Sequence, residues 1–390
     1  MTTNSFDFDS PVDRRNTASV KWDRYKGKDI LPLWVADMDF KAPPAVLDAL
    51  HRQVEHGVFG YTYPSEELTA SVVAMLKDRH GWAVKSEWIV WLPGLVTGIN
   101  VACRAVGSQG DAGMTCTPVY PPFLSAPALG GRGLITVPHQ SDGKRYGFDF
   151  DAIEKAITPE TKLFLLCNPQ NPTGRVFSQK ELHRLSEICL QHGMVICSDE
   201  IHCDLVLDSD KQHVSLAALD GAIAARTITL LAPSKTYNIP GLGCSLAVIP
   251  DGKLRSSFRK TMEGIVPHVN ILGLTAALAA YRDSEDWRLA LIDYLRGNRD
   301  LLEAFISRMD GLSMPHVEAT YLAWIDCRKL PAENPTLFFE DAGVGLSDGK
   351  EFGVPGFVRL NFGCPCSTLS EALLRMEQAV LRLSSPRRQV

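Results

Sequence analysis

Short apolar runs alternate with amphipathic segments through the middle of the chain. Helical spacing of apolar residues predicts helices over 95–106, 150–157 and 179–192. Apolar runs predict strands over 88–92, 114–118, 133–138, 163–167, 194–198, 227–231 and 245–249. Nearly continuous apolar strands separated by helices are typical of a parallel sheet that is covered on both faces. We therefore expect an α/β fold, with a three-layer domain around a mostly parallel central sheet.

The pattern changes towards both ends of the chain. The predicted helices there are 45–54, 66–80, 286–309 and 369–383, and the predicted strands of a smaller sheet are 321–327 and 357–362. A chain of 390 residues exceeds what one compact core usually holds. We predict a large domain over 45–285 and a smaller α+β domain formed by both termini, 1–44 and 286–390.

Composition narrows the class of protein. With 45% hydrophobic residues, 22% charged residues and a net charge of −5, the chain has no basic patch for nucleic acid or anionic lipid. The first residues lack the apolar core of a signal peptide, and the apolar stretch 265–281 is interrupted by Pro267, His268 and Asn270. We expect a cytoplasmic protein that binds neither nucleic acid nor membrane.

The ten cysteines do not indicate disulfides or a metal site. They are spread through predicted strands and helices without a Cys-x-x-Cys pair, which favours buried free thiols. Cys364 and Cys366 form a close pair but have no further ligand at metal-binding spacing. No metal is expected.

Candidate functional residues follow the ends of successive predicted strands, where parallel sheets bind their ligands. In chain order they are Gly94, Leu95 and Val96, then Tyr120, then Asn171, then Asp199 and His202, and finally Ser234 and Lys235. A glycine turn that opens a helix offers free backbone N–H groups to a phosphate, although such a turn is often purely structural. Each feature alone has an ordinary structural explanation, and their order along the sheet is what favours a shared site.

The chemistry of these residues fits pyridoxal phosphate. A partly desolvated lysine can attack a carbonyl, so Lys235 is a candidate to form a Schiff base. A carboxylate buried at a strand end costs several kcal/mol unless it is paired, and a protonated ring nitrogen would pair with Asp199. Tyr120 offers a ring for stacking, and Asn171 can donate a hydrogen bond to a phenolate oxygen. The sequence therefore predicts a pyridoxal phosphate site.

At these residues the chain resembles the fold-type I pyridoxal phosphate enzymes of the class I/II aminotransferase-like superfamily. Within them it is similar to the PatB/MalY-type cystathionine β-lyases, or cysteine C–S lyases, over nearly its whole length. The superfamily marks are 168–174, Asp199 and Lys235. The marks of the lyase subgroup are 21–23, 34–40, 59–62, 199–202, 234–236 and 361–365.

The resemblance implies a role for each candidate. Lys235 would be the Schiff-base lysine and then the base that removes the Cα proton, and Arg359 would bind the substrate carboxylate together with Asn171. Either Tyr120 or Tyr61 would assist proton handling at the leaving sulfur, and the sequence does not choose between them. The reaction would release a thiol, pyruvate and ammonia from L-cystathionine or related cysteine S-conjugates. The implied cofactor contacts are Gly94, Leu95, Val96, Ser234 and Tyr61 at the phosphate, and Tyr120, Asn171, Asp199 and His202 at the ring. Tyr61 would come from a second subunit, which implies a homodimer with shared sites.

Some positions depart from common aminotransferases. Many of those enzymes carry a tyrosine three residues after the aspartate, a serine three before the lysine and an arginine eight after it. Here these positions hold His202, Ala232 and Gly243. An aminotransferase remains the first alternative, and a regulatory protein on the same scaffold the second, although intact Lys235 and Asp199 favour catalysis. Cys366 stands where relatives commonly carry arginine, and nothing in the sequence explains that change.

Overall fold

A mixed sheet forms the centre of the molecule in the computed structural model, which describes residues 6–384. Its strands follow the order β2-β10-β9-β8-β7-β3-β4. Strand β10 runs in the direction opposite to all the other strands of this sheet. They are β2 (Ile89–Leu92), β3 (Ala112–Thr117), β4 (Gly133–Pro138), β7 (Thr161–Cys167), β8 (Val195–Asp199), β9 (Thr227–Leu231) and β10 (Ser245–Val248). The predicted mostly parallel sheet and its strands are confirmed.

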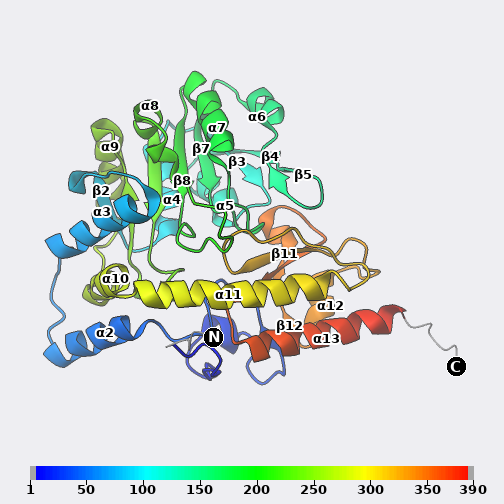
Figure 1. Ribbon diagram of the computed structural model, residues 1–390. Coiled ribbons are helices and arrows are strands. Elements are labelled where there is room, and N and C mark those ends of the chain that lie inside the picture. The colour runs from blue at the N-terminus through cyan, green and yellow to red at the C-terminus, as the bar shows by residue number, and fades with distance from the viewer. Residues whose placement is uncertain (1–5, 385–390) are drawn as a thin grey trace, which may run out of the picture.

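Helices cover both faces of this sheet (Figure 1). Leu163 and Leu165 of β7 pack on the face covered by α4, α5 and α9, whereas Phe164 and Leu166 pack on the face covered by α6 and α7. This alternation is the two-residue period of a strand that is buried on both sides. The covering helices are α4 (Leu95–Ala105), α5 (Pro122–Leu129), α6 (Phe150–Ala156), α7 (Gln179–Gln191), α8 (Gly221–Ala224) and α9 (Gly252–Met262). The α/β architecture is therefore the three-layer arrangement expected from the sequence.

A second set of elements lies beyond the long helix α11 (Glu285–Ile306), with α2, β12 and α13 on the side of α11 that faces away from the large sheet (Figure 1). A smaller antiparallel sheet has the order β11-β14-β13. Its strands are β11 (Leu322–Asp326), β13 (Ser347–Asp348) and β14 (Phe357–Asn361). Helix α12 (Pro335–Asp341) packs on this sheet and α13 (Cys366–Ser384) packs on α12, whereas α2 (Pro44–His56) and α3 (Glu66–His80) pack on α10 (Ile271–Asp283) near the other end of α11 (Figure 1). A parallel pairing of β1 (Leu31–Pro32) with β12 (Val344–Gly345) joins the two ends of the chain.

Several short or unusual elements were not predicted. They are α1 (Val20–Asp23), α5, α8, α9, α10, α12, β1, the hairpin of β5 (Gln140–Ser141) and β6 (Tyr146–Gly147), β12 and β13. Helix α5 begins at Pro122 and contains Pro127, so its composition reads as a loop. Helix α10 is buried along most of its length and therefore lacks the polar face that marks an amphipathic helix.

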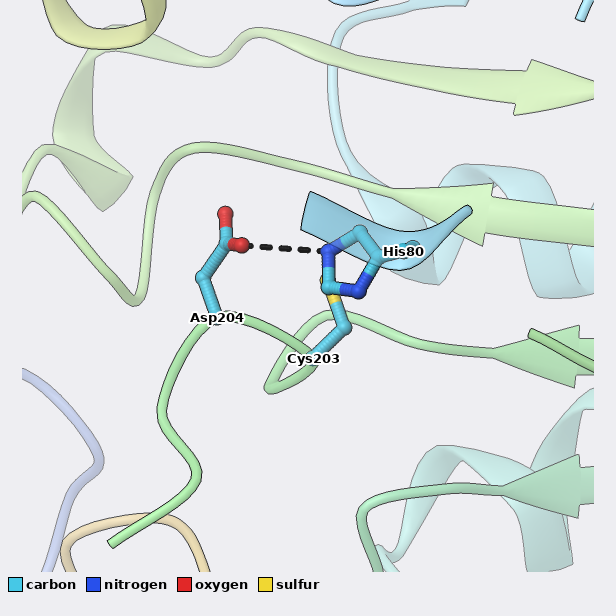
Figure 2. A group of neighbouring side chains, drawn as sticks. All are labelled: His80, Cys203 and Asp204. Atoms are coloured by element: carbon cyan, nitrogen blue, oxygen red, sulfur yellow. Dashed lines mark hydrogen bonds and ion pairs between the residues drawn. The ribbon is translucent and has the colours of Figure 1, made fainter. Parts of the chain in front are cut away.

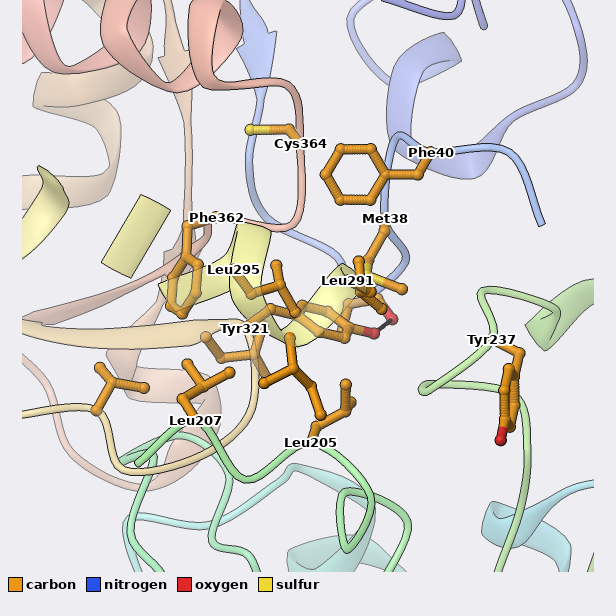
Figure 3. Packing of buried hydrophobic residues seen from close by; sticks show 14 of the residues in the cluster. Met38, Phe40, Leu205, Leu207, Tyr237, Leu291, Leu295, Tyr321, Phe362 and Cys364 are labelled. Carbon is orange, nitrogen blue, oxygen red and sulfur yellow. Dashed lines mark hydrogen bonds between the residues drawn. The ribbon is translucent and has the colours of Figure 1, made fainter. Parts of the chain in front are cut away.

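One hydrophobic cluster connects α11 to both sheets. Figure 3 shows Leu291 and Leu295 of α11 between Met38 and Phe362 on one side and Leu205 on the other. All of these side chains are nearly inaccessible to solvent. The predicted domains thus share a core, and the boundaries near residues 45 and 286 remain a prediction. No helix within residues 6–384 has both the length and the apolar composition that crossing a bilayer requires.

A buried ion-pair network holds the segment 34–40 in place, and we call residues 34–40 the crossing segment. Asp39 accepts hydrogen bonds from Lys21 Nζ (2.7 Å), Trp22 Nε1 (2.8 Å) and Arg14 Nη1 (2.7 Å). Lys21 is fully buried and also donates to the carbonyl oxygen of Asp37 (3.0 Å). Attraction between these charges lowers the pKa of the Asp39 carboxyl even though burial alone would raise it. The network anchors a segment that reaches the functional site.

We expect Lys21→Met to lower the free energy of unfolding by about 3 kcal/mol, because it leaves the buried Asp39 carboxylate short of a cation. The exposed Lys28 provides the matched control, and Lys28→Met should change the stability by less than about 0.5 kcal/mol. Urea unfolding of both variants measures the difference. Equal stability of the two variants would contradict the structural role of the network.

Candidate functional site

Lys235 lies in the turn that follows β9, where it is partly buried. Its Nζ atom donates a hydrogen bond to the carbonyl oxygen of Ala36 at 2.5 Å, although the two residues are 199 positions apart in the sequence. Burial first, and then the charge of Arg359, lower the pKa of Lys235 to about 8, while Asp37 and Asp199 oppose this shift. A sizeable fraction of the amine is therefore neutral near neutral pH, as a nucleophile or a base requires.

Asp199 is the last residue of β8 and is also buried. Its Oδ1 atom accepts a hydrogen bond from the backbone N–H of Ile201 at 3.1 Å. Burial raises the pKa of the Asp199 carboxyl to about 7 in spite of this bond and of the nearby Lys235 charge. A cation placed against this carboxyl would recover the energy that burial of its charge costs.

Arg359 projects from β14 and is buried beside Asn171. Its Nη1 donates to Asn171 Oδ1 at 3.1 Å, and its Nη2 donates to the carbonyl oxygen of Trp34 at 2.7 Å. The guanidinium lies over the ring of Phe352, 4.7 Å from the ring centroid, and burial lowers its pKa to about 10. Among the described residues Arg359 Nε has no hydrogen-bond partner. The side chain can therefore bind a carboxylate without first breaking an ion pair.

His202 and Tyr120 complete the group around Lys235. His202 is buried, and burial followed by the charges of Lys235 and Arg359 lowers its pKa to about 3, so its ring is neutral. Its Nδ1 has no partner within residues 6–384. Tyr120 follows β3 and is partly buried, which raises the pKa of its phenol, and the charges of Arg359 and Asp199 both act on it. The structure thus brings the predicted ring-binding residues together.

Gly94 is the N-cap of α4, and Leu95 and Val96 are the first residues of that helix. The cap has no side-chain hydrogen bond, so the first N–H groups of α4 are left for another acceptor. Ser234 lies next to Lys235, in a turn closed by a hydrogen bond from the Ile239 N–H to the Ser234 carbonyl oxygen (3.0 Å).

Gly243 occupies the position where common aminotransferases carry an arginine, and its backbone conformation disfavours a side chain. It adopts a left-handed conformation with φ of +59°, and a Cβ atom there would come 3.1 Å from the carbonyl oxygen of Pro93. A side chain at this position would be strained and would crowd the turn that precedes α4. The position eight residues after Lys235 therefore serves the packing of the backbone.

Tyr61 stands apart from this group. Its side chain is fully exposed, in the connection between α2 and α3. Thr62 and Tyr63 beside it border a surface cavity that is also lined by Pro267 and His268. Within one chain the structure does not place Tyr61 among the other predicted site residues.

The residues present fit pyridoxal phosphate on their own chemistry. Asp199 is a buried carboxyl that needs a cation, and His202 Nδ1 and Arg359 Nε are buried polar atoms that have no partner among the described residues. Lys235 supplies an amine that loses its proton easily, and α4 supplies uncapped N–H groups. A planar cation with an anionic tail would satisfy these groups together.

A cluster of candidate metal ligands lies behind the site and was not predicted. His80, Cys203 and Asp204 offer ligand atoms within 4.8 Å of one another, and Figure 2 shows the imidazole of His80 directed at the Asp204 carboxylate. His80 Nε2 lies 3.1 Å from Asp204 Oδ1, and Arg79 Nη1 binds Asp204 Oδ2 at 3.0 Å. Burial also raises the pKa of the Cys203 thiol well above its usual value. An ion-pair network explains this arrangement better than a metal ion, which the Arg79 charge would repel.

The packing of the cysteines agrees with the expectation of buried free thiols. The ten cysteines are free, and all except Cys366 are buried. Cys366 Sγ lies 3.9 Å from Ser370 Oγ at the start of α13. The structure gives no further account of the change from arginine at this position.

Several residues that shape the site have no role that the sequence predicts. The crossing segment contributes the carbonyl oxygens of Trp34 and Ala36, and Asn238 holds it by accepting from the Met38 N–H (2.9 Å) and donating to the Phe40 carbonyl oxygen (2.7 Å). Tyr321 donates to the Ala36 carbonyl oxygen at 3.0 Å. The run 34–40 was noticed as a motif, but backbone carbonyls carry no residue-type signal that a sequence could reveal.

Comparison with known proteins places the whole chain in one group. A family model for aminotransferase class I and II matches residues 28–376. Cystathionine β-lyase PatB of Bacillus subtilis is 38% identical over 96% of this chain and 99% of its own length. A crystal structure of OvoB superposes with a TM-score of 0.94 at 47% identity, covering 96% of this chain and 99% of that one. Cystalysin of Treponema denticola, whose crystal structure contains pyridoxal 5′-phosphate, superposes with a TM-score of 0.92 at 33% identity, covering 97% and 99%.

The raised pKa of Asp199 predicts how the stability of the cofactor-free protein depends on pH. Since the folded carboxyl keeps its proton up to about pH 7 while the unfolded one loses it near 3.8, stability should fall as the pH rises between these values. Asp199→Asn should remove this fall and stabilise the cofactor-free protein above pH 7, by on the order of 3 kcal/mol. Urea unfolding from pH 4 to 8 tests this. A difference between variant and wild type that is the same at every pH would contradict it.

Proposed function

The chain belongs to the aminotransferase class I and II family, and we propose that it is a pyridoxal-phosphate-dependent carbon–sulfur β-lyase. The reaction splits the Cβ–S bond of L-cystathionine or a related cysteine S-conjugate, and it yields a thiol, pyruvate and ammonia. The observation that carries this proposal is that the buried Asp199 and Arg359 both act on the charge of the partly buried Lys235 at one site. The names of PatB and of other relatives, which are cystathionine β-lyases or putative ones, favour this reaction over the alternatives.

In this proposal Arg359 and Asn171 bind the substrate carboxylate. The guanidinium is desolvated, and Asn171 already accepts a bond from its Nη1, so both donors are fixed before the substrate arrives. A carboxylate bound to this planar fork has one orientation, which also fixes the direction of the Cα–H bond. The residue thus selects amino acids and aligns the bond that breaks.

Proton transfer falls to Lys235. Pyridoxal phosphate, when bound, withdraws electrons from the substrate Cα and so makes its proton acidic. Nζ of Lys235 takes that proton, which a pKa of about 8 allows near neutral pH. The electron pair left at Cα forms the Cα–Cβ double bond as the Cβ–S bond breaks, and the sulfur leaves as a thiolate. Water then hydrolyses the resulting enamine to pyruvate and ammonia.

Asp199, His202 and Tyr120 support this chemistry through charge and contact. Asp199 supplies the negative charge for a protonated ring nitrogen, and the neutral His202 offers a hydrogen bond near the ring oxygen without adding charge. Tyr120 would stack on the ring, and Tyr120 or Tyr61 would protonate the leaving thiolate. The first N–H groups of α4 and the Ser234 hydroxyl would bind the phosphate.

A homodimer would complete the site. Tyr61 is fully exposed in one chain, and the connection around it also exposes Val58, Phe59 and Tyr63. Exposed aromatic and apolar side chains in a group are typical of protein interfaces. In the proposed dimer Tyr61 of each subunit reaches the phosphate in the partner's site. A cytoplasmic location agrees with the composition and with buried free cysteines.

Pyruvate release tests the lyase proposal directly. Purified protein loaded with pyridoxal phosphate should release pyruvate from L-cystathionine with no keto acid added, and Lys235→Ala should lower the rate at least about 1000-fold because the base is lost. The exposed Lys253 gives the control, and Lys253→Ala should retain the wild-type rate. Amino transfer to 2-oxoglutarate without pyruvate release would instead identify an aminotransferase. The same assay with cystine and S-alkyl cysteines defines the preferred side chain.

Mixing two inactive variants tests the shared site. Tyr61→Ala should weaken phosphate binding in the partner's site, and Lys235→Ala should inactivate its own site. After subunit exchange in an equal mixture, one site in each mixed dimer is intact, so about a quarter of the wild-type activity should return. A monomer in analytical ultracentrifugation, or a mixture no more active than its parts, would overturn the shared-site proposal.

A further inference from the structure

Asp37 of the crossing segment has a carboxylate oxygen that the rest of the molecule leaves free. Its Oδ2 atom binds Arg14 Nη2 at 2.5 Å, whereas Oδ1 is buried and has no hydrogen-bond partner among residues 6–384. A buried carboxylate oxygen without a donor costs free energy, so such an atom calls for a partner such as a water, an ion or a ligand. Asp37 directly follows Ala36, whose carbonyl oxygen accepts the hydrogen bond from Lys235 Nζ.

Asp37 is one of the charged groups that act on Lys235. Lys235 and Arg359 are buried cations that lie close enough for the guanidinium to lower the pKa of the lysine. Two carboxylates, Asp37 and Asp199, oppose that effect. Asp199 is assigned to the ring nitrogen of the cofactor in the proposed function. Asp37 is paired with Arg14 through Oδ2 alone, so its Oδ1 is the carboxylate oxygen left for a positive charge that enters with the substrate.

The crossing segment meets both charged ends of an amino acid. At Trp34 its carbonyl oxygen orients the Arg359 guanidinium, which is the proposed receptor for the α-carboxylate. Two residues later, the Ala36 carbonyl oxygen accepts the hydrogen bond from Lys235, and the next residue, Asp37, keeps a buried carboxylate oxygen without a partner among residues 6–384. A zwitterion placed on Arg359 by its carboxylate carries its ammonium group towards Lys235, and it needs an acceptor there because two cations surround it.

We propose that Asp37 is a substrate-positioning residue whose free Oδ1 atom receives the α-ammonium group of the incoming amino acid. This rests on the proposed function in one respect, namely that the substrate is an amino acid. It also explains the motif at 34–40, which the rest of the proposed function leaves without a chemical role.

The surroundings of Asp37 hold it ready for this task. Its Oδ2 is fixed by Arg14, and its carbonyl oxygen accepts hydrogen bonds from Lys21 Nζ (3.0 Å) and Asn361 Nδ2 (2.7 Å). Arg14 also binds Asp39, so the same guanidinium ties two carboxylates of the segment. Because these contacts exist before any substrate binds, the Asp37 side chain loses little conformational entropy on binding. The site is preorganised for a cation.

The decisive comparison uses two ligands that differ by the amino group. Asp37→Asn keeps the shape of the side chain and its contact with Arg14 but removes the charge. In the holoenzyme we expect the KM for S-methyl-L-cysteine to rise about tenfold or more, since a hydrogen bond to a charged group is lost. The inhibition constant of 3-(methylthio)propionate, which lacks the ammonium group, should change less than about twofold. Equal weakening of both ligands would overturn the proposal.

A second readout does not depend on catalysis. In the cofactor-free protein the pH dependence of Lys235 acylation reports the pKa of its amine, about 8 in the wild type. The charged groups facing the lysine are Arg359, Asp37 and Asp199, and Asp37 raises this pKa. The acylation midpoint should therefore fall in Asp37→Asn and stay near 8 in Asp37→Glu, which keeps the charge. An unchanged midpoint in Asp37→Asn would also overturn the proposal.

Asp39→Asn supplies the matched control, because Asp39 belongs to the same segment but its oxygens are already occupied by Lys21, Trp22 and Arg14. It should lower the melting temperature while leaving the ratio of the two ligand affinities as in the wild type. A ratio that shifts as much in Asp39→Asn as in Asp37→Asn would show that disorder of the segment, and not the Asp37 charge, is responsible. If the wild type releases no pyruvate, the lyase proposal fails while the Lys235 midpoint still tests Asp37.

Discussion

The hydrogen bond from Lys235 Nζ to the Ala36 carbonyl oxygen is the contact around which the site is built. It joins the turn after β9 to the crossing segment, which the Arg14, Lys21 and Asp39 network anchors at its other end. Burial of the amine in this contact lowers its pKa, and the same burial keeps water from competing for its hydrogen bonds. The packing of the N-terminal segment and the environment of the lysine are therefore linked.

Several ionisable groups in this protein are buried, and their burial lowers its stability. Asp199 has a raised pKa, while Arg359 and His202 have lowered ones, and in each case burial is the largest cause. Groups that are poorly solvated and incompletely paired are typical of sites that wait for a ligand. The structural pairs behave differently: Asp39 and Asp204 bind cations that lower their pKa in spite of burial. The direction of the pKa shift therefore distinguishes residues that stabilise the fold from residues that are placed to bind a ligand.

The order of strands and the residues that follow them could be read from the sequence because a parallel sheet has a simple pattern. Apolar runs marked the strands of the large sheet, and the carboxyl ends of these strands carried Asn171, Asp199 and Lys235. Elements without that pattern were missed. Helix α5 is interrupted by proline, helix α10 is buried along most of its length, and the two-residue strands β1 and β12 depend on a partner far away in the chain.

The sequence by itself determined the fold class, the cofactor chemistry and the residue types of the site, because side-chain chemistry and strand periodicity are local properties of the chain. The tertiary structure decided what is not local. It set the pKa of Lys235 through burial, brought Arg359 to Asn171, and placed Gly243 in a left-handed conformation close to the Pro93 carbonyl oxygen. It also left one oxygen of Asp37 without a donor, since hydrogen-bond satisfaction depends on groups that the fold collects from distant parts of the chain.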